Sequence, residues 1–277
     1  MHKIEFMPDN NLTSKKAVAT VKHKMLKKKI LSIDVSLGSY KFFIENIITA
    51  AKNGESKYVC IANVHMLVEA HNNSSFAHVV NSADIVTPDG VPITWAIKLL
   101  YGITQERVAG MDLLPDLLKQ MEKLKLPVFF YGGTQVMLSA TSTYIHQHYP
   151  LLTIAGKYSP PFRTLTSIEE LNIIDHINAS GAAMVFVVLG CPKQEKWMAL
   201  MKGKINSVMV GIGGALPVMT GMQKRAPQWM QHNGLEWLFR FGQEPQRLFK
   251  RYAVTNSTFL FLLIKEIICN NKRKPKI

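Results

Sequence analysis

The sequence predicts an α/β protein whose core is a Rossmann-like, doubly wound and mostly parallel sheet, followed by a C-terminal helical appendage. Short continuous apolar runs recur along residues 29–221, and amphipathic helical patterns separate them. After Gly221 the pattern changes to helical stretches with no predicted strand. Continuous apolar runs are typical of parallel strands that helices cover on both faces. With 47% apolar residues in 277, the chain can bury a large core.

The first half of the sheet domain alternates strands and helices. Its apolar runs predict strands at 30–37, 58–63 and 83–88. Apolar residues at helical spacing predict helices at 40–52, from 64 to 80, at 91–101 and at 112–124. Pro88-Asp89-Gly90 forms the turn that opens the helix at 91–101.

The second half continues the alternation. It predicts strands at 127–133, 152–156, 183–190 and 207–214, of which AMVFVVLG at 183–190 is the most apolar. Helical patterns fill the intervals at 135–148, 167–178 and 192–201. The domain prediction is therefore a basic, poorly ordered lead-in over 1–28, a sheet domain over 29–221 and a basic, aromatic helical appendage over 222–277.

The charge indicates a polyanionic partner. Lys and Arg number 33 against 19 Asp and Glu, which gives a formal net charge of +14. From Thr220 onward, eleven Lys and Arg face three acids, and the run Lys15–Lys29 holds seven lysines and no acid. Nucleic acid, an anionic membrane and a phosphorylated substrate are all compatible with this excess. A solvated tail would also explain the run Lys15–Lys29.

Three distant cysteines, Cys60, Cys191 and Cys269, argue against a disulfide framework and a zinc site and fit a reducing compartment. The polar N-terminus lacks the apolar stretch of a signal peptide. No run reaches the ~18 consecutive apolar residues of a membrane span. The apolar stretch 258–264 suits an interfacial or packing helix better than a span.

Ligands of an open parallel sheet bind beyond the carboxyl ends of its strands. This rule selects the loops at 63–65, 88–90, 132–133, 190–194 and 211–214. Neither a G-x-G-x-x-G fingerprint nor a G-x-x-x-x-G-K-[ST] loop occurs, which lowers the odds of a dehydrogenase or an NTPase.

Asp89 is the candidate catalytic residue on these loops. It is either the N-cap of the following helix or a carboxylate in a cleft that serves as a general base. His65 is the other titratable candidate, with a structural role as the alternative. Asn63 and Gln194 either hold sugar hydroxyl groups or satisfy loop backbone. Arg107 either forms a surface salt bridge or binds phosphate with its two-pronged guanidinium group.

The chain contains no Asp-x-Asp pair, with which many nucleotide-sugar transferases hold a divalent cation. We therefore predict a metal-independent site in which protein cations neutralise the donor diphosphate. Arg240, Arg247 and Arg251 are spaced to share one helical face. A helix break at Glu244-Pro245 would interrupt that face.

Five segments in order carry a family resemblance: ADIVTPDGVPITWA (83–96), ERVAGMDLLP (106–115), LGCPKQEKWM (189–198), VGIGGALPVMTGMQKRAPQWM (210–230) and GLEWLFRFGQEPQRLFKRY (234–252). Together they resemble the WecG/TagA/CpsF family of bacterial glycosyltransferases over roughly residues 30–252.

The resemblance implies an inverting transfer of a sugar from a UDP donor to an undecaprenyl-diphosphate-linked acceptor in polysaccharide biosynthesis. Relatives transfer N-acetylmannosamine, its uronic acid or other sugars. The resemblance assigns the base to Asp89 and the substrate pocket to Asn63, Arg107 and Gln194. It assigns closure over the donor diphosphate to Arg240 and Arg247, with Arg251 nearby.

The resemblance also implies a peripheral enzyme on the cytoplasmic face of the cell membrane. Its tail would bind anionic lipid and favour an active monomer over a homo-oligomer formed away from the membrane. No cofactor and no nucleic acid are expected as partners.

Two positions depart from the family pattern. Ile61 stands where relatives often carry Thr, and His65, a predicted substrate-binding residue, stands where they often carry Glu. Because both changes flank the predicted pocket, the transferred sugar cannot be carried over from the family.

Two other functions remain open from the residues alone. A non-enzymatic membrane or nucleic-acid binding module would explain the charge but not the glycine and carboxylate pattern at the strand ends. Another nucleotide-dependent α/β enzyme would explain both.

Overall fold

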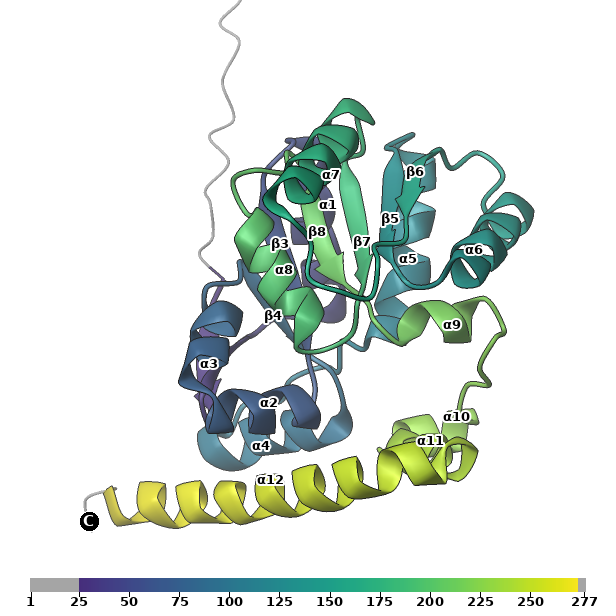
Figure 1. Ribbon diagram of the computed structural model, residues 1–277. Helices are drawn as coiled ribbons and strands as arrows, with labels where there is room; N and C mark the ends of the chain where they lie inside the picture. Colours follow the sequence, from purple (N-terminus) through teal and green to yellow (C-terminus); the bar gives the residue numbers. More distant parts are fainter. Residues whose placement is uncertain (1–24, 274–277) are drawn as a thin grey trace, which may run out of the picture.

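A computed structural model describes residues 25–273 of the chain. Its centre is a six-stranded, all-parallel sheet, which confirms the predicted Rossmann-like α/β fold (Figure 1). The strand order is β4-β3-β8-β7-β5-β6. The strands are β3 (Lys57–Ala62), β4 (Ile85–Pro88), β5 (Val128–Gly132), β6 (Ile154–Tyr158), β7 (Met184–Val188) and β8 (Val208–Gly211).

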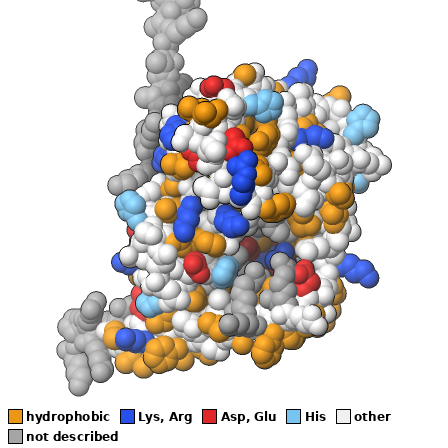
Figure 2. Space-filling view, in the orientation of Figure 1, with side chains coloured by type: hydrophobic (Ala, Val, Ile, Leu, Met, Phe, Trp, Pro, Cys, Tyr) orange, Lys and Arg blue, Asp and Glu red, His pale blue; other side chains and the backbone are white. Residues whose placement is uncertain are grey.

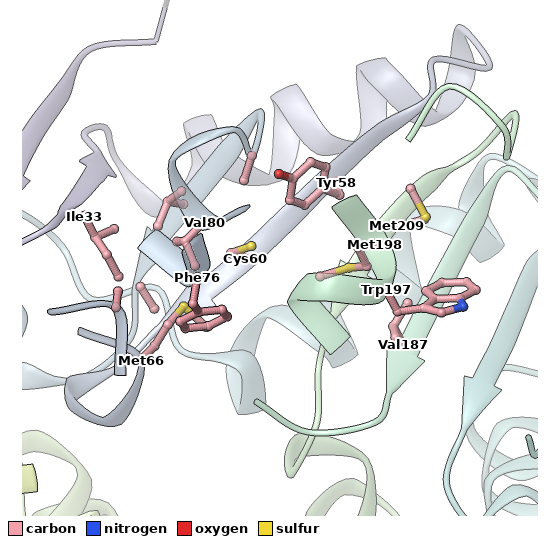
Figure 3. Close-up of a cluster of buried hydrophobic side chains, with 14 of the residues drawn as sticks. Ile33, Tyr58, Cys60, Met66, Phe76, Val80, Val187, Trp197, Met198 and Met209 are labelled. Carbon is pink, nitrogen blue, oxygen red and sulfur yellow. The ribbon is translucent and has the colours of Figure 1, made fainter. Parts of the chain in front are cut away.

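Helices cover both faces of this sheet because successive strand residues point to opposite sides. Tyr58 and Cys60 of β3 join one buried cluster, part of which Figure 3 shows, while Val59 and Ile61 join the other. The first cluster includes residues of α2 (Val64–Asn72), α3 (Ser74–Asn81), α4 (Val91–Tyr101), α7 (Ser167–Ala179) and α8 (Lys193–Met201). The second includes residues of α1 (Tyr40–Lys52), α5 (Gly110–Lys123), α6 (Gln135–His148) and α9 (Ala215–Met219).

The strand predicted at 30–37 is confirmed over β2 (Ile33–Ser36), but it is shorter than predicted and does not belong to the main sheet. This segment is the turn and second strand of an antiparallel hairpin, in which β1 (Lys27–Ile30) pairs with β2 (Ile33–Ser36) apart from the main sheet. Leu31 lies in the turn with a φ of 54°, a conformation that its residue type does not signal. The hairpin also begins inside the lead-in predicted over 1–28, most of which lies outside the described residues. Lys27 is anchored there, its Nζ donating to the Ala83 carbonyl at 2.8 Å.

The helical pattern predicted from 64 to 80 is two helices. Asn73 separates α2 from α3, and its side chain accepts a hydrogen bond from the Phe76 amide at 3.0 Å. This cap satisfies an amide at the start of α3 and explains the break, because Asn competes well for helix N-termini.

The appendage consists of α10 (Gln228–His232), α11 (Glu236–Gln243) and α12 (Pro245–Arg273). The break predicted at Glu244-Pro245 is confirmed, since α11 ends at Gln243 and α12 begins at Pro245. Arg240 therefore lies on a different helix from Arg247 and Arg251, and the three arginines do not share one helical face.

α12 runs beneath α2 and α4, on the side of the molecule toward which the strands' carboxyl ends point (Figure 1). Phe259 and Leu263 of α12 are each 6% exposed and belong to the core cluster of the sheet domain. The Glu266 carboxylate accepts a hydrogen bond from the Leu31 amide at 3.2 Å. The C-terminal helix is thus part of the packed domain rather than a segment attached at one end.

Within the described residues, one helix passes a length and composition test for a membrane span. The window is Tyr252–Cys269 of α12, with a mean hydropathy of 1.4 and 17% of it buried. Buried core helices of other proteins pass the same test. The packing of Phe259 and Leu263 agrees with the prediction of an interfacial or packing helix.

Candidate active site at the carboxyl edge of the sheet

Four adjacent strands present the predicted loops side by side. In the order β4-β3-β8-β7, their carboxyl ends lead into Asp89, Asn63, the 211–214 loop and the 190–194 loop. In the fifth predicted loop, at 132–133, close packing against a neighbouring strand explains the glycine at position 132. A Cβ on Gly132 would lie 2.7 Å from the Val188 carbonyl oxygen.

Asp89 follows β4 directly. Its amide donates to the Ala62 carbonyl at 2.7 Å, so the backbone continues the pairing with β3 for one more residue. The N-cap of α4 is Gly90, with a φ of 106° and no capping side chain. The interpretation of Asp89 as an N-cap is therefore wrong, and its carboxylate is available for another role.

The Asp89 carboxyl group is partly buried, and burial is the main cause that raises its pKa to about 7. The charge of Glu236 acts in the same direction, whereas Arg107 and Arg240 oppose it. Groups with a pKa near the working pH are the most effective general bases. This environment suits a carboxyl group that must both hold and release a proton near neutrality.

Burial of this carboxyl group predicts a pH-dependent stability. Because its folded pKa exceeds the ordinary value of 3.8, its contribution to the free energy of unfolding is lost as pH rises from about 4 to 7. Asp89→Asn removes that loss. We compare the free energy of unfolding of the variant with that of the unaltered chain. The difference should grow in favour of the variant by about 1–2 kcal/mol from pH 5 to pH 8, after allowance for the partial exposure of Asp89. Urea unfolding at both pH values measures the gain, and a constant difference would contradict it.

Arg107 lies next to Asp89 because the Val108 amide donates to the Pro88 carbonyl at 2.9 Å. Its guanidinium group joins two carboxylates, Nη1 to Glu236 Oε2 at 2.5 Å and Nη2 to Asp112 Oδ2 at 3.0 Å. Arg225 binds the other oxygen of Asp112. This network connects the sheet domain to the appendage, so the salt-bridge interpretation of Arg107 describes the observed contacts. Its role toward phosphate is a prediction.

Asn63 is the N-cap of α2. Its Oδ1 accepts a hydrogen bond from the Met66 amide at 3.1 Å, which is the backbone role considered as its alternative. His65 is half-buried in the first turn of the same helix. Ile61, the first departure from the family pattern, is 6% exposed. It packs near Gly110 on the face of β3 that is turned away from α2. That substitution therefore lies in the core below the edge.

Gln194 is 5% exposed and already bonded within the protein. Its Oε1 accepts from the Gly190 amide at 3.1 Å, and its Nε2 donates to Glu195 Oε1 at 2.8 Å. Added Cβ atoms on Gly211 and Gly213 would lie 3.0 and 3.2 Å from the Gln194 amide group. These glycines let the loop after β8 pack directly on Gln194.

Arg240 extends from α11 over the loop after β8. Its Nη2 lies 3.5 Å from the Gly214 carbonyl oxygen. The side chains of Arg247 and Arg251 lie outside the described part of the structure. Arg240, the predicted tail arginine whose side chain is described, lies at this edge, where its charge acts on Asp89.

Two functional candidates were missed by sequence reasoning. Glu236 and Asp112 both bind Arg107, and both charges act on Asp89. Each lies within one of the five family segments, Glu236 in GLEWLFRF and Asp112 in ERVAGMDLLP. Their place within these segments is the sequence signal that could have identified them as site residues.

No group of three or more His, Cys, Asp or Glu side chains that could hold a metal ion occurs within residues 25–273. The three cysteines are free thiols.

The fold and this edge define a class: an α/β protein with a carboxyl group of raised pKa beside arginines at the carboxyl edge of its sheet. A family comparison narrows the class, since the profile of the glycosyl transferase WecG/TagA/CpsF family matches residues 28–273. The chain belongs to that family and is a glycosyltransferase.

Curated relatives are similar over most of the chain. An N-acetylglucosaminyldiphosphoundecaprenol N-acetyl-beta-D-mannosaminyltransferase of Bacillus spizizenii is 32% identical over 216 residues, covering 78% of this chain and 81% of the relative. The enzyme of the same name from Bacillus subtilis is 31% identical over 68% of this chain and 72% of its own. The Staphylococcus aureus enzyme is 27% identical over 76% and 82%.

Proposed function

We propose that the chain transfers a sugar from a UDP donor to an undecaprenyl-diphosphate-linked acceptor, with inversion at the anomeric carbon, in cell-surface polysaccharide biosynthesis. The names of the relatives support a lipid-diphosphate-linked N-acetylglucosamine as the acceptor and an N-acetylmannosamine-type sugar as the donor. The observation that carries the proposal is the Asp89 carboxyl group, with a pKa of about 7, at a carboxyl edge that the arginine-bearing α11 covers.

In the proposed mechanism, Asp89 removes the proton from an acceptor hydroxyl group as that oxygen attacks the anomeric carbon of the donor. The bond to UDP breaks on the opposite face, and negative charge grows on the departing diphosphate. A fixed cation at that position stabilises the transition state. Arg240 is the described side chain best placed for this role, and Arg247 and Arg251 remain predicted partners. Asn63, His65 and Gln194 remain predicted substrate-binding residues.

The experiment that tests the function combines a synthetic lipid-diphospho-N-acetylglucosamine with a panel of UDP-sugars. Release of UDP that requires both substrates supports the proposal, and the panel identifies the donor sugar. Salt-sensitive nucleic-acid binding without UDP release would favour the non-enzymatic alternative, which the family membership disfavours. Release with no lipid acceptor would indicate another nucleotide-dependent reaction.

We further propose that the enzyme works without a divalent cation. Because the proposed site relies on arginines to neutralise the diphosphate, 5 mM EDTA should change the rate of UDP release by less than about twofold. An Asp-x-Asp transferase assayed in parallel provides the control. Loss of activity that Mg²⁺ or Mn²⁺ restores would contradict this prediction.

The proposed location is the cytoplasmic face of the membrane, with α12 in contact with lipid. Leu260, Phe261, Ile264 and Ile268 form an exposed apolar face along α12, between 48% and 67% exposed. Figure 2 shows hydrophobic side chains along the lower edge of the molecule, where α12 lies. Lys and Arg near an anionic surface each add about 1 kcal/mol. In the proposal, the protein binds the membrane through this face as a monomer, and it forms a homo-oligomer when it is not bound to the membrane.

A further inference from the structure

Glu236 is a carboxylate that the appendage brings into the site. It begins α11, and its Oε2 lies 2.5 Å from Arg107 Nη1, a contact between residues 129 positions apart. The two side chains are 21% and 18% exposed, so the pair is largely shielded from water. A shielded ion pair of this kind fixes the position of both side chains.

The second carboxylate oxygen of Glu236 is buried and has no hydrogen-bond partner among the described residues. Buried polar atoms are nearly always paired in folded proteins, so an oxygen with no partner among the described residues is a candidate for binding a ligand. A carboxylate oxygen can only accept hydrogen bonds. The missing partner is therefore a donor group, and sugar hydroxyl groups are such donors.

The Glu236 carboxylate is close enough to Asp89 for its charge to raise the pKa of Asp89. The charged groups that act on Asp89 are Glu236 and Arg240 of α11, Arg107 of the loop before α5, and Asp112 of α5. After β3, the first turn of α2 carries the titratable residue His65.

We propose that Glu236 is a substrate-binding residue delivered by the appendage. Arg107 holds its Oε2, while its Oε1 accepts a hydrogen bond from a sugar hydroxyl group beside Asp89. Arg107 is then a positioning residue, and Arg240 stabilises the negative charge of the departing diphosphate. The inference rests on the proposed function and assigns a role to one residue within it.

Glu236→Gln tests the proposal because it keeps the side-chain size and removes the charge. A hydrogen bond to a charged group is worth about 10–100-fold in affinity. KM for one of the two sugar substrates should rise by about that factor, while the other KM stays within about twofold. The acid limb of the pH profile of kcat/KM should also move down by roughly 0.5–1 pH unit, because a negative charge near Asp89 is lost.

Glu266→Gln is the matched control, since Glu266 joins α12 to the β1–β2 hairpin and not to the site. It should leave both KM values and the pH profile unchanged. A purely structural role for Glu236 would not raise the KM of one sugar substrate selectively. Unchanged values in folded E236Q would overturn the proposal.

A second measurement needs no turnover. The difference in unfolding free energy between the unaltered chain and D89N depends on pH through the ionisation of Asp89. Its midpoint should move to lower pH when both proteins carry E236Q, and an unmoved midpoint would overturn the placement of Glu236 beside Asp89. If the unaltered chain releases no UDP, the proposed function fails while this measurement still tests Glu236.

Discussion

Asp89→Asn should lower the turnover number for UDP release by about 10²–10⁴-fold while the affinity for the UDP-sugar stays within a few-fold. Asparagine keeps the shape of the side chain but cannot accept the proton of the acceptor hydroxyl group. The donor is bound mainly through other groups in the proposed mechanism. Steady-state kinetics with the lipid-linked acceptor measure the turnover number, and calorimetric titration of the UDP-sugar without acceptor measures its affinity.

Asp175→Asn is the matched control for this variant, because Asp175 is exposed on α7. The control should retain full activity. Turnover of D89N near that of the control would exclude Asp89 as the base and transfer the hypothesis to His65, which His65→Gln would then test.

Replacement of two apolar residues on the exposed face of α12 should release the protein from membranes. Phe261 and Ile264 are 67% and 48% exposed, and burial of such side chains in lipid contributes about 1.5–3 kcal/mol each. The double variant F261S/I264S should bind vesicles containing anionic lipid at least about 100-fold more weakly. Co-sedimentation with vesicles measures the loss. Because neither side chain is in the core, the melting temperature should be unchanged.

L151S/I168S is the matched control, since Leu151 and Ile168 are 76% and 71% exposed but lie outside the appendage. It should bind vesicles as the unaltered chain does. Equal binding by both double variants would mean that α12 is not the lipid-binding surface.

The sequence predicted the layered fold because buried parallel strands leave a clear signal. The run at 183–190 contains β7, whose five residues are all buried. The hairpin at β1–β2 was missed because β1 (Lys27–Ile30) consists of three lysines and one isoleucine, which give no apolar signal for a strand. Its turn at Leu31 depends on backbone geometry rather than on residue type.

The candidate site was predictable to the extent that it lies at strand ends. Asp89 and Asn63 follow β4 and β3 directly, so the rule for parallel sheets selected them. Glu236 was not selected, because an acidic residue in a basic segment is expected to form surface ion pairs with its sequence neighbours. Its contact with Arg107 joins residues 129 positions apart, and no local pattern specifies such a pairing. The strand order that aligns the loops is likewise a long-range property.

The packing of α12 has a consequence for the proposed membrane binding. The two helices on which it lies, α2 and α4, begin immediately after Asn63 and after Asp89-Gly90. In the proposed membrane-bound state, a displacement of α12 would act on α2 and α4 through the shared core in which Phe259 and Leu263 are packed. The proposal thus makes lipid thickness and curvature variables of the chemical step, and under it a detergent micelle would not be an equivalent substitute for a bilayer.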